Sequence, residues 1–299
     1  MLIRVTQAFA PAASRRAPAA MILMSALALA GCEGQVTADM VTDAPADVSI
    51  QQVNASITGL EFRKDDGGTE TLSFTDGQPV NLLDYLDGNA FRLFTDEELP
   101  DGTYTGVRLT FEDDPADDPV IVDADGDSFP LTIAEGDYAD LNFSIEEDES
   151  SEDAFTLVLD LRQSLTFNDD DDEYTLQPYL RAVGEGTSGE ITGAVDITCP
   201  TGTSLADGGA VYLFTGEDVE PDDRDGAGVE PFATTDVFQT TDGSRAYGLR
   251  FLPEGDYTIA VTCEGDLESP DTDDDDMDFQ MMDNVQVEED RTVRVDFAD

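Results

Sequence analysis

The feature that most constrains the fold is an alternation of apolar and polar residues with a period of two, which recurs along the chain from Gln35 onward. In the stretch 155–162, four apolar residues share one face, and the residues between them, including Asp160 and Arg162, share the other. Successive side chains of a strand point to opposite faces, so this pattern predicts strands with one buried face. Asp- and Gly-rich turns separate the stretches, and we therefore predict an all-β protein.

Two segments depart from simple alternation. The apolar positions change phase within 48–62, which predicts a β-bulge near Gly59. A short helix is predicted over 79–86, because Pro79 suits a first helical turn and Gly88 is placed to end it.

The N-terminal segment is predicted to be a secretory signal. Arg4, Arg15 and Arg16 precede an apolar run over 21–30, which is the order of a signal peptide. The run is about half of the ~20 residues that a helix needs to cross a bilayer. Interpreting Arg15 and Arg16 as a twin-arginine export signal is less favoured, because the residues after them lack the apolar position of that motif.

The apolar run ends in Leu29-Ala30-Gly31-Cys32, which resembles the lipobox of bacterial lipoproteins. The resemblance implies cleavage before Cys32 and attachment of a diacylglycerol to its thiol, so the expected partner is a membrane, reached through a lipid anchor. The alternative is an ordinary cleaved signal. Glu33 follows, whereas Asp at that place favours retention in Gram-negative lipoproteins. We therefore expect an outer-membrane location, facing either the periplasm or the cell surface.

The charge is extreme. The chain has 68 acidic and 14 basic residues. Three of the basic residues lie in the signal and no acidic residue precedes Glu33, so the mature chain carries 68 acids against 11 bases, a formal charge of −57 (11 − 68). Such a charge repels nucleic acids, which are excluded as partners, and anionic lipid surfaces. It is typical of an exported protein from a marine or halophilic bacterium; a cation store is the alternative.

Two cysteines remain after Cys32. Cys199 and Cys263 continue the core-facing parity of the strands before them, in a compartment that oxidises thiols. We predict a disulfide between them, with two buried free thiols as the alternative.

The chain divides by pattern into a signal peptide (1–31), a first β-sandwich domain (32–183), a Gly-rich linker (184–189) and a second β-sandwich domain (190–299). Seven short strand candidates follow the linker, which is typical of a sandwich. Each domain contains a Pro-x-Gly-x-Tyr turn, ending at Tyr104 and Tyr257. We interpret both tyrosines as structural, with a ligand-stacking role as the alternative.

Each domain resembles a known family. The first resembles a bacterial family described only as domain of unknown function 4382, in Val41–Ala46, Val53–Ile57, Asn81–Asp84, Leu99–Tyr104, Arg108-Leu109 and Gln177–Val183. That resemblance implies an exported β-rich lipoprotein and no chemistry. The second is similar to carboxypeptidase regulatory-like, transthyretin-type sandwiches, in Ile191–Val195, Gly209–Leu213, Thr240–Ser244, Leu252–Thr258 and Thr292–Phe297. This second pattern implies a fold more than a function.

The sequence offers little catalytic chemistry. It contains no His, the commonest general base and zinc ligand. Ser188 and Ser244 lie in Gly-rich turns but not in a G-x-S-x-G elbow, and Lys64 is the single lysine. We therefore predict no catalytic residue, no cofactor and no dedicated metal site, and keep a carboxylate-based hydrolase as a remote alternative.

Calcium and glycan binding are the more serious alternatives. Asp123, Asp125 and Asp127 alternate as calcium ligands in a turn can, although a hairpin turn with Asp125-Gly126 at its tip is favoured. A glycan platform would have to come from Tyr85, Tyr138 and Tyr247, since the chain has no Trp. We expect a membrane-anchored envelope lipoprotein that is a non-catalytic structural or binding module, with an envelope protein or a glycan as its partner.

The charge generates a prediction about stability. With 57 excess negative charges in the mature chain (68 − 11), self-repulsion opposes the compact state, and salt screens it over a length of roughly 3 Å at 1 M. The melting temperature should therefore rise as NaCl is raised from low to molar concentration. A melting temperature that stays flat or falls over that range would contradict the halophilic interpretation.

Overall fold

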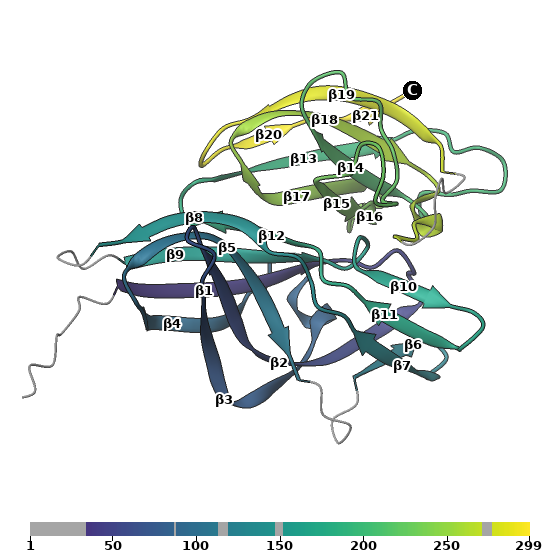
Figure 1. Cartoon of the computed structure of the whole chain (residues 1–299). Coiled ribbons are helices and arrows are strands. Elements are labelled where there is room, and N and C mark those ends of the chain that lie inside the picture. The colour runs from purple at the N-terminus through teal and green to yellow at the C-terminus, as the bar shows by residue number, and fades with distance from the viewer. Residues whose placement is uncertain (1–33, 87, 113–118, 147–151, 271–276) are drawn as a thin grey trace, which may run out of the picture. The chain divides into compact units, whose positions relative to one another are not determined.

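The computed structural model describes residues 34–86, 88–112, 119–146, 152–270 and 277–299. They form strands and short 3-10 helices, so the all-β prediction is confirmed (Figure 1). None of the helices in these ranges is long and apolar enough to cross a membrane. Cys32 and the predicted signal lie outside the described residues.

The N-terminal strands form two sheets. Sheet I has the order β12-β9-β1-β4, made of β1 (Gly34–Asp43), β4 (Phe91–Leu99), β9 (Glu152–Asp160) and β12 (Leu180–Gly184). Sheet II has the order β10-β11-β7-β6-β2-β5-β8, with β3 also paired to β2. Its strands are β2 (Ile50–Lys64), β3 (Thr69–Asn81), β5 (Gly102–Phe111), β6 (Val120–Asp123), β7 (Ser128–Ile133), β8 (Ala139–Ile145), β10 (Leu165–Asn168) and β11 (Glu173–Leu176).

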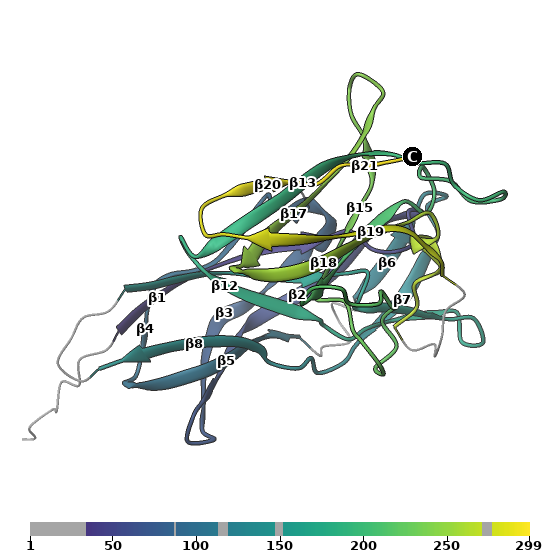
Figure 2. The same ribbon diagram turned by 90° about the horizontal axis from the view of Figure 1, so that it is seen from above.

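The C-terminal strands form two more sheets, seen from above in Figure 2. Sheet III has the order β16-β17-β13-β20, with β21 also paired to β13. Its strands are β13 (Ser188–Asp196), β16 (Phe238–Gln239), β17 (Arg245–Pro253), β20 (Thr292–Arg294) and β21 (Phe297–Ala298). Sheet IV has the order β15-β14-β18-β19, made of β14 (Ala210–Thr215), β15 (Ala233–Asp236), β18 (Gly255–Thr262) and β19 (Phe279–Val287).

Each pair of sheets encloses its own hydrophobic core. Met40 and Leu157 from sheet I pack in one buried cluster with Phe62 and Tyr104 from sheet II. A separate cluster combines residues of sheets III and IV, such as Tyr247 and Ile259. The sheets therefore pack face to face as β-sandwiches.

The bulge predicted near Gly59 is confirmed. The register of β2 against β5 shifts between Ile57 and Gly59, so the residue between them is extra. Residues before the bulge are buried at odd positions, and Leu60 and Phe62 are buried after it. A Cβ at position 59 would lie 2.0 Å from the Leu72 carbonyl oxygen of β3, so only glycine fits there.

The helix predicted over 79–86 is wrong in length and type. The structure has a single 3-10 turn, η1 (Leu82–Tyr85), whose start is capped by the Asn81 side chain through the Leu83 amide at 3.3 Å. Pro79 lies instead in β3, where it pairs with Ser56. Tertiary strand pairing therefore overrides the local signal of a proline at a helix start.

Both Pro-x-Gly-x-Tyr turns are structural, as predicted. The Tyr104 hydroxyl donates a hydrogen bond to the Pro100 carbonyl oxygen at 2.7 Å, and the Tyr257 hydroxyl donates one to the Pro253 carbonyl oxygen at 2.9 Å. Both rings are buried in the cores. Each tyrosine therefore joins its turn to its core, which leaves neither ring available for stacking on a ligand.

The seven strand candidates after the predicted linker all appear. The candidate over 231–238 is broken in two, as β15 and β16, and so is the candidate over 292–297, as β20 and β21. Within the predicted linker, Gly184 ends β12 and Ser188 begins β13. Only residues 185–187 form a turn.

Cys199 and Cys263 form a disulfide, with Cα atoms 5.8 Å apart. Cys199 follows β13 of sheet III and Cys263 follows β18 of sheet IV, so the bond joins the two faces of the C-terminal sandwich. Both side chains pack in the core cluster between those sheets.

Removal of the disulfide should destabilise the protein. The bond spans 64 residues, and the chain-entropy model gives about 4 kcal/mol for a loop of that size. Replacing both cysteines with alanine should lower the free energy of unfolding by that order, measured by denaturant titration. Reducing the unaltered protein is the matched control and should give the same loss. Two alkylated cysteines in unreduced, denatured protein from the periplasm would contradict the bond.

Candidate functional site

The acidic hairpin considered for calcium is a closed turn. One carboxylate oxygen of Asp123 accepts hydrogen bonds from the backbone amides of Asp125 and Asp127, at 3.0 and 2.9 Å. Gly126 has the positive φ of 86° that such a turn needs. The hairpin between β6 and β7 is therefore confirmed. Among the described residues, no group of three or more acidic or cysteine side chains converges as a metal site.

The three tyrosines considered for a glycan platform do not form one. Tyr247 is buried and donates its hydroxyl to the Val295 carbonyl oxygen at 2.8 Å. Tyr138 is half-buried, with the guanidinium carbons of Arg63 and Arg108 at 5.0 and 4.6 Å from its ring centroid. Tyr85 packs against Phe91, with ring centroids 5.1 Å apart.

The structure instead brings together a buried polar network between the turn that follows β9 and the strands of sheets III and IV. Asp160 ends β9 and is fully buried. Its carboxylate accepts the Gln163 amide at 3.2 Å, which caps the turn at 161–164, and the Gln163 side chain at 2.8 Å. It also accepts the backbone amide of Thr234 at 3.0 Å and the Thr234 hydroxyl at 2.9 Å. Asp160 therefore connects β9 to β15.

Arg162 lies in the same turn, and its side chain is 2% exposed. The guanidinium pairs with Asp236 at the end of β15 and donates to the carbonyl oxygen of Gly265, which begins η3 (Gly265–Leu267). Its Nε has no hydrogen-bond partner among the described residues. A buried donor without an acceptor is costly, so this atom marks a place where a further acceptor would be favourable.

Arg181 of β12 makes a second connection. Its guanidinium donates to Asp43 of β1 at 3.2 Å and to the carbonyl oxygen of Arg250, in β17, at 3.5 Å. The guanidinium carbon also lies 5.8 Å from the ring centroid of Phe232. Arg181 is buried, so two arginines and one aspartate carry the polar contacts between sheet I and the C-terminal strands.

Glu268, just after η3, is another buried carboxylate of this region. It accepts the Tyr212 hydroxyl at 2.9 Å and the Arg224 amide at 3.2 Å. Burial nevertheless raises the pKa of Glu268 from 4.5 to about 8, because removal from water opposes its charged form more than these two hydrogen bonds favour it.

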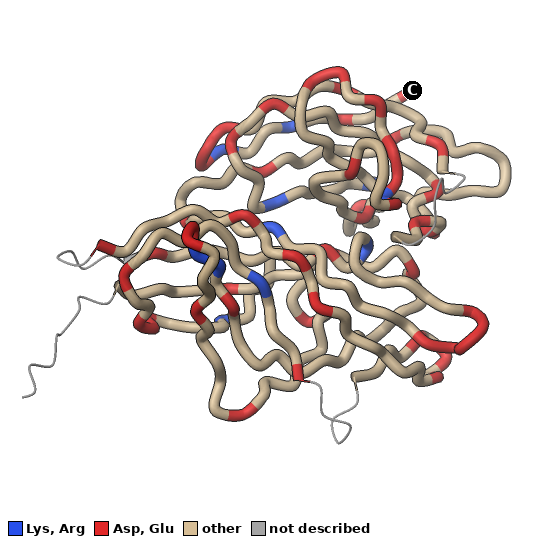
Figure 3. Tube along the Cα trace, viewed as in Figure 1, with Lys and Arg blue, Asp and Glu red and all other residues tan. Residues whose placement is uncertain are grey.

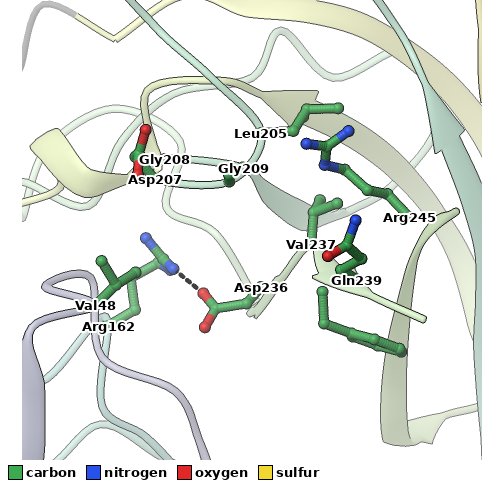
Figure 4. A pocket seen from close by; sticks show the side chains of 12 residues that line it. Val48, Arg162, Leu205, Asp207, Gly208, Gly209, Asp236, Val237, Gln239 and Arg245 are labelled. Atoms are coloured by element: carbon green, nitrogen blue, oxygen red, sulfur yellow. Dashed lines mark hydrogen bonds and ion pairs between the residues drawn. The ribbon is translucent and has the colours of Figure 1, made fainter. Parts of the chain in front are cut away.

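A cavity of about 370 Å³ opens beside the network (Figure 4). Arg162 and Asp236 form one wall, and Arg245 and Gln239 project from the other side. Apolar side chains complete the lining, with Val48 and Phe238 at its rim 55% and 47% exposed. The cavity has the size of a small-molecule site.

The polar groups of this network bind one another and so hold the strands in place. The oxygens of Asp160 are occupied by donors from Gln163 and Thr234, and Arg162 neutralises Asp236. A general base needs a lone pair facing the substrate, which Asp160 does not offer. The arrangement can orient strands against each other, and the cavity beside it can hold a ligand.

The sequence pattern placed Asp160 and Arg162 on the polar face of their strand but did not reveal that this face is covered. One signal was present: Val158 lies on that same face and is 1% exposed. An apolar residue among polar ones indicates partial cover by another element.

Residues 33–178 match the family model described as "Domain of unknown function (DUF4382)", which agrees with the resemblance of the first domain. The match covers the strands of the N-terminal sandwich from β1 to β11 and ends before β12. No curated protein matches the chain.

Three solved structures align with low scores. The TIE protein of Bacillus anthracis is 11% identical, and the alignment covers 89% of this chain and 34% of that one, with a TM-score of 0.20. The chain thus spans about a third of its length. GBS52, the minor pilin of Streptococcus agalactiae, is 14% identical, and the alignment covers 88% of this chain and 95% of that one, with a TM-score of 0.21. A putative cell adhesion protein of Bacteroides fragilis is 11% identical, and the alignment covers 88% of this chain and 92% of that one, with a TM-score of 0.20. Scores this low carry no argument about fold or function.

The raised pKa of Glu268 predicts how stability depends on pH. The folded state holds this proton more tightly than the unfolded chain, so stability should fall as pH rises from about 4.5 to about 8 and then level off. The effect is a few kcal/mol, at about 1.4 kcal/mol per pKa unit. Denaturant titrations of Glu268→Gln across that range should lack the part of this loss that comes from Glu268. The part below about pH 7 that comes from Asp43, whose pKa is raised by burial to about 7, should remain.

The control for this pH dependence is Glu254→Gln, which removes an exposed carboxylate and should retain the pH dependence of the unaltered protein. Parallel stability curves for Glu268→Gln and the unaltered protein would show that Glu268 is ionised in the folded state at neutral pH.

Proposed function

We propose that the protein is an outer-membrane lipoprotein, anchored through Cys32, whose β-sandwich body is a non-catalytic structural and binding module of the cell envelope. The observation that carries this proposal is the order of basic segment, apolar run and Leu29-Ala30-Gly31-Cys32 at the N-terminus. A tethered body needs no catalytic group, and the buried charges of this one are occupied in joining its strands.

The geometry supports a rigid module. Asp160, Arg162 and Arg181 are each at most 4% exposed, and all three contact residues of the C-terminal strands. Removing one partner from such a buried charged contact typically costs about 3–5 kcal/mol. The polar contacts therefore favour one fixed arrangement of the strands that they connect.

The hydrolase alternative is weakened by the same contacts. A carboxylate-based hydrolase needs two acids facing a substrate across a cleft. Asp160 faces Gln163 and Thr234 instead, and Glu268 faces Tyr212. The alternative of a glycan that stacks on exposed tyrosines is weakened as well, because the guanidinium groups of Arg63 and Arg108 lie over the ring of Tyr138.

Replacement of Cys32 tests the anchor. Cys32→Ser should move the full chain from the membrane fraction to the soluble fraction and abolish labelling by a fatty-acid probe, because the thiol that takes the lipid is gone. Ser25→Ala, a change within the predicted signal, is the matched control and should remain in the membrane and labelled. Unchanged partitioning of Cys32→Ser into detergent would refute the proposal.

A further inference from the structure

Every basic side chain that the structure describes, except one, pairs with a carboxylate. The paired residues are Arg63, Lys64, Arg92, Arg108, Arg162, Arg181, Arg224, Arg250, Arg291 and Arg294. Arg245 has no carboxylate partner within the described ranges, although acids outnumber bases in the mature chain by 68 to 11. An arginine left unpaired amid so many acids needs an explanation.

The acid closest to Arg245 in sequence is turned away from it. Asp242 accepts the hydroxyls of Thr240 and Ser244 at 2.6 and 2.8 Å, and the Ser244 amide at 3.1 Å. These hydrogen bonds lower the pKa of Asp242 to about 2. The hairpin between β16 and β17 thus closes on its own acid, and the guanidinium of Arg245 has no carboxylate partner among the residues that the structure describes.

Arg245 lines the 370 Å³ cavity beside the buried network. It is half-buried and stands next to Gln239, its partner in the β16–β17 register (Figure 4). Across the cavity lies Arg162, whose Nε has no acceptor among the described residues. Two arginines therefore line one cavity, and Arg245 is the one without a carboxylate partner within the described ranges.

The acids of the cavity do not supply the missing acceptor. Asp236 pairs with Arg162, and Asp207 accepts the Ser204 hydroxyl at 2.7 Å. The charge of the chain is overwhelmingly negative (Figure 3), so an arginine without a carboxylate partner within the described ranges is unusual on this protein. The exposed rim residues Val48 and Phe238 add apolar surface at its mouth.

We propose that this cavity binds a small ligand that carries a carboxylate beside an apolar group. The planar fork of Arg245 matches a carboxylate in bidentate geometry, and Val48 and Phe238 can cover the apolar part. The volume is at the lower end of the roughly 300–1,000 Å³ typical of ligand sites, so the ligand has the size of a single amino-acid residue. This inference rests on the proposed binding role and names the class of ligand.

The test measures binding by the full chain in detergent with ligand-observed NMR, with empty micelles subtracted. The probes are N-acetyl-L-phenylalanine, its amide, and glucuronate, which has the carboxylate but no apolar group. Work in 1 M NaCl shortens the screening length to roughly 3 Å and so removes the repulsion of a distant acidic surface. N-acetyl-L-phenylalanine should bind about tenfold tighter than either other probe, the effect of one charge-assisted contact.

Two variants locate the binding. Arg245→Gln should reduce the preference for the carboxylate over the amide to about one, and Arg294→Gln, which removes an exposed paired arginine, should keep it. Melting temperatures report that both variants fold. The proposal would be overturned if N-acetyl-L-phenylalanine and its amide bound equally tightly, or if glucuronate bound as tightly as N-acetyl-L-phenylalanine. It would also be overturned if the two variants lost the preference for the carboxylate equally. Because anchoring at Cys32 is measured by fractionation, failure here leaves the anchor untouched, and failure of the anchor leaves this test valid.

Discussion

Scarcity of positive charge is the constraint on which the rest of this structure depends. Residues 33–299 include 11 bases and 68 acids, so most carboxylates must stay in water, and each arginine taken inside has to be matched. The two most buried arginines, Arg162 and Arg181, are both used where sheet I meets the C-terminal strands. Asp43 and Asp236 accordingly pair with these arginines, and Asp160 accepts from several neutral donors, because an unpaired buried charge costs several kcal/mol.

The buried contacts explain which arrangement the strands adopt better than they explain how stable that arrangement is. Apolar residues of equal volume often stabilise a contact as well as a buried ion pair does. Asp160 differs from an apolar residue because its hydrogen bonds are directional. Both its oxygens accept hydrogen bonds from Gln163 on its own turn and from Thr234 on β15. A shift of β15 by one residue would present a different side chain and break the hydrogen bonds. The network thus selects one register between strands whose apolar cores are separate.

Much of the fold could be predicted because its signals are local. Period-two alternation marks the strands, and a phase change marks the bulge at Gly59, where β2 must pass close to the backbone of β3. The Pro-x-Gly-x-Tyr turns carry their own hydrogen bond from Tyr104 or Tyr257, four residues along the chain. The helix over 79–86 failed for the opposite reason. Pro79 suits a helix start locally, but pairing with Ser56, which is distant in sequence, holds it in a strand.

The site was not predictable from the sequence because alternation states which residues share a face and not what covers that face. Asp160 and Arg162 occupy the polar face of their stretch, as alternation requires, and the polar face of a strand with this alternation usually meets water. Here the face meets β15 and η3, whose sequence positions lie 70 to 100 residues away, as the contacts to Thr234 and Gly265 show. Arg245 is harder still to predict, because its distinction is that no carboxylate of the described residues pairs with it. Such a property belongs to the folded arrangement of all the charges, and no stretch of sequence contains it.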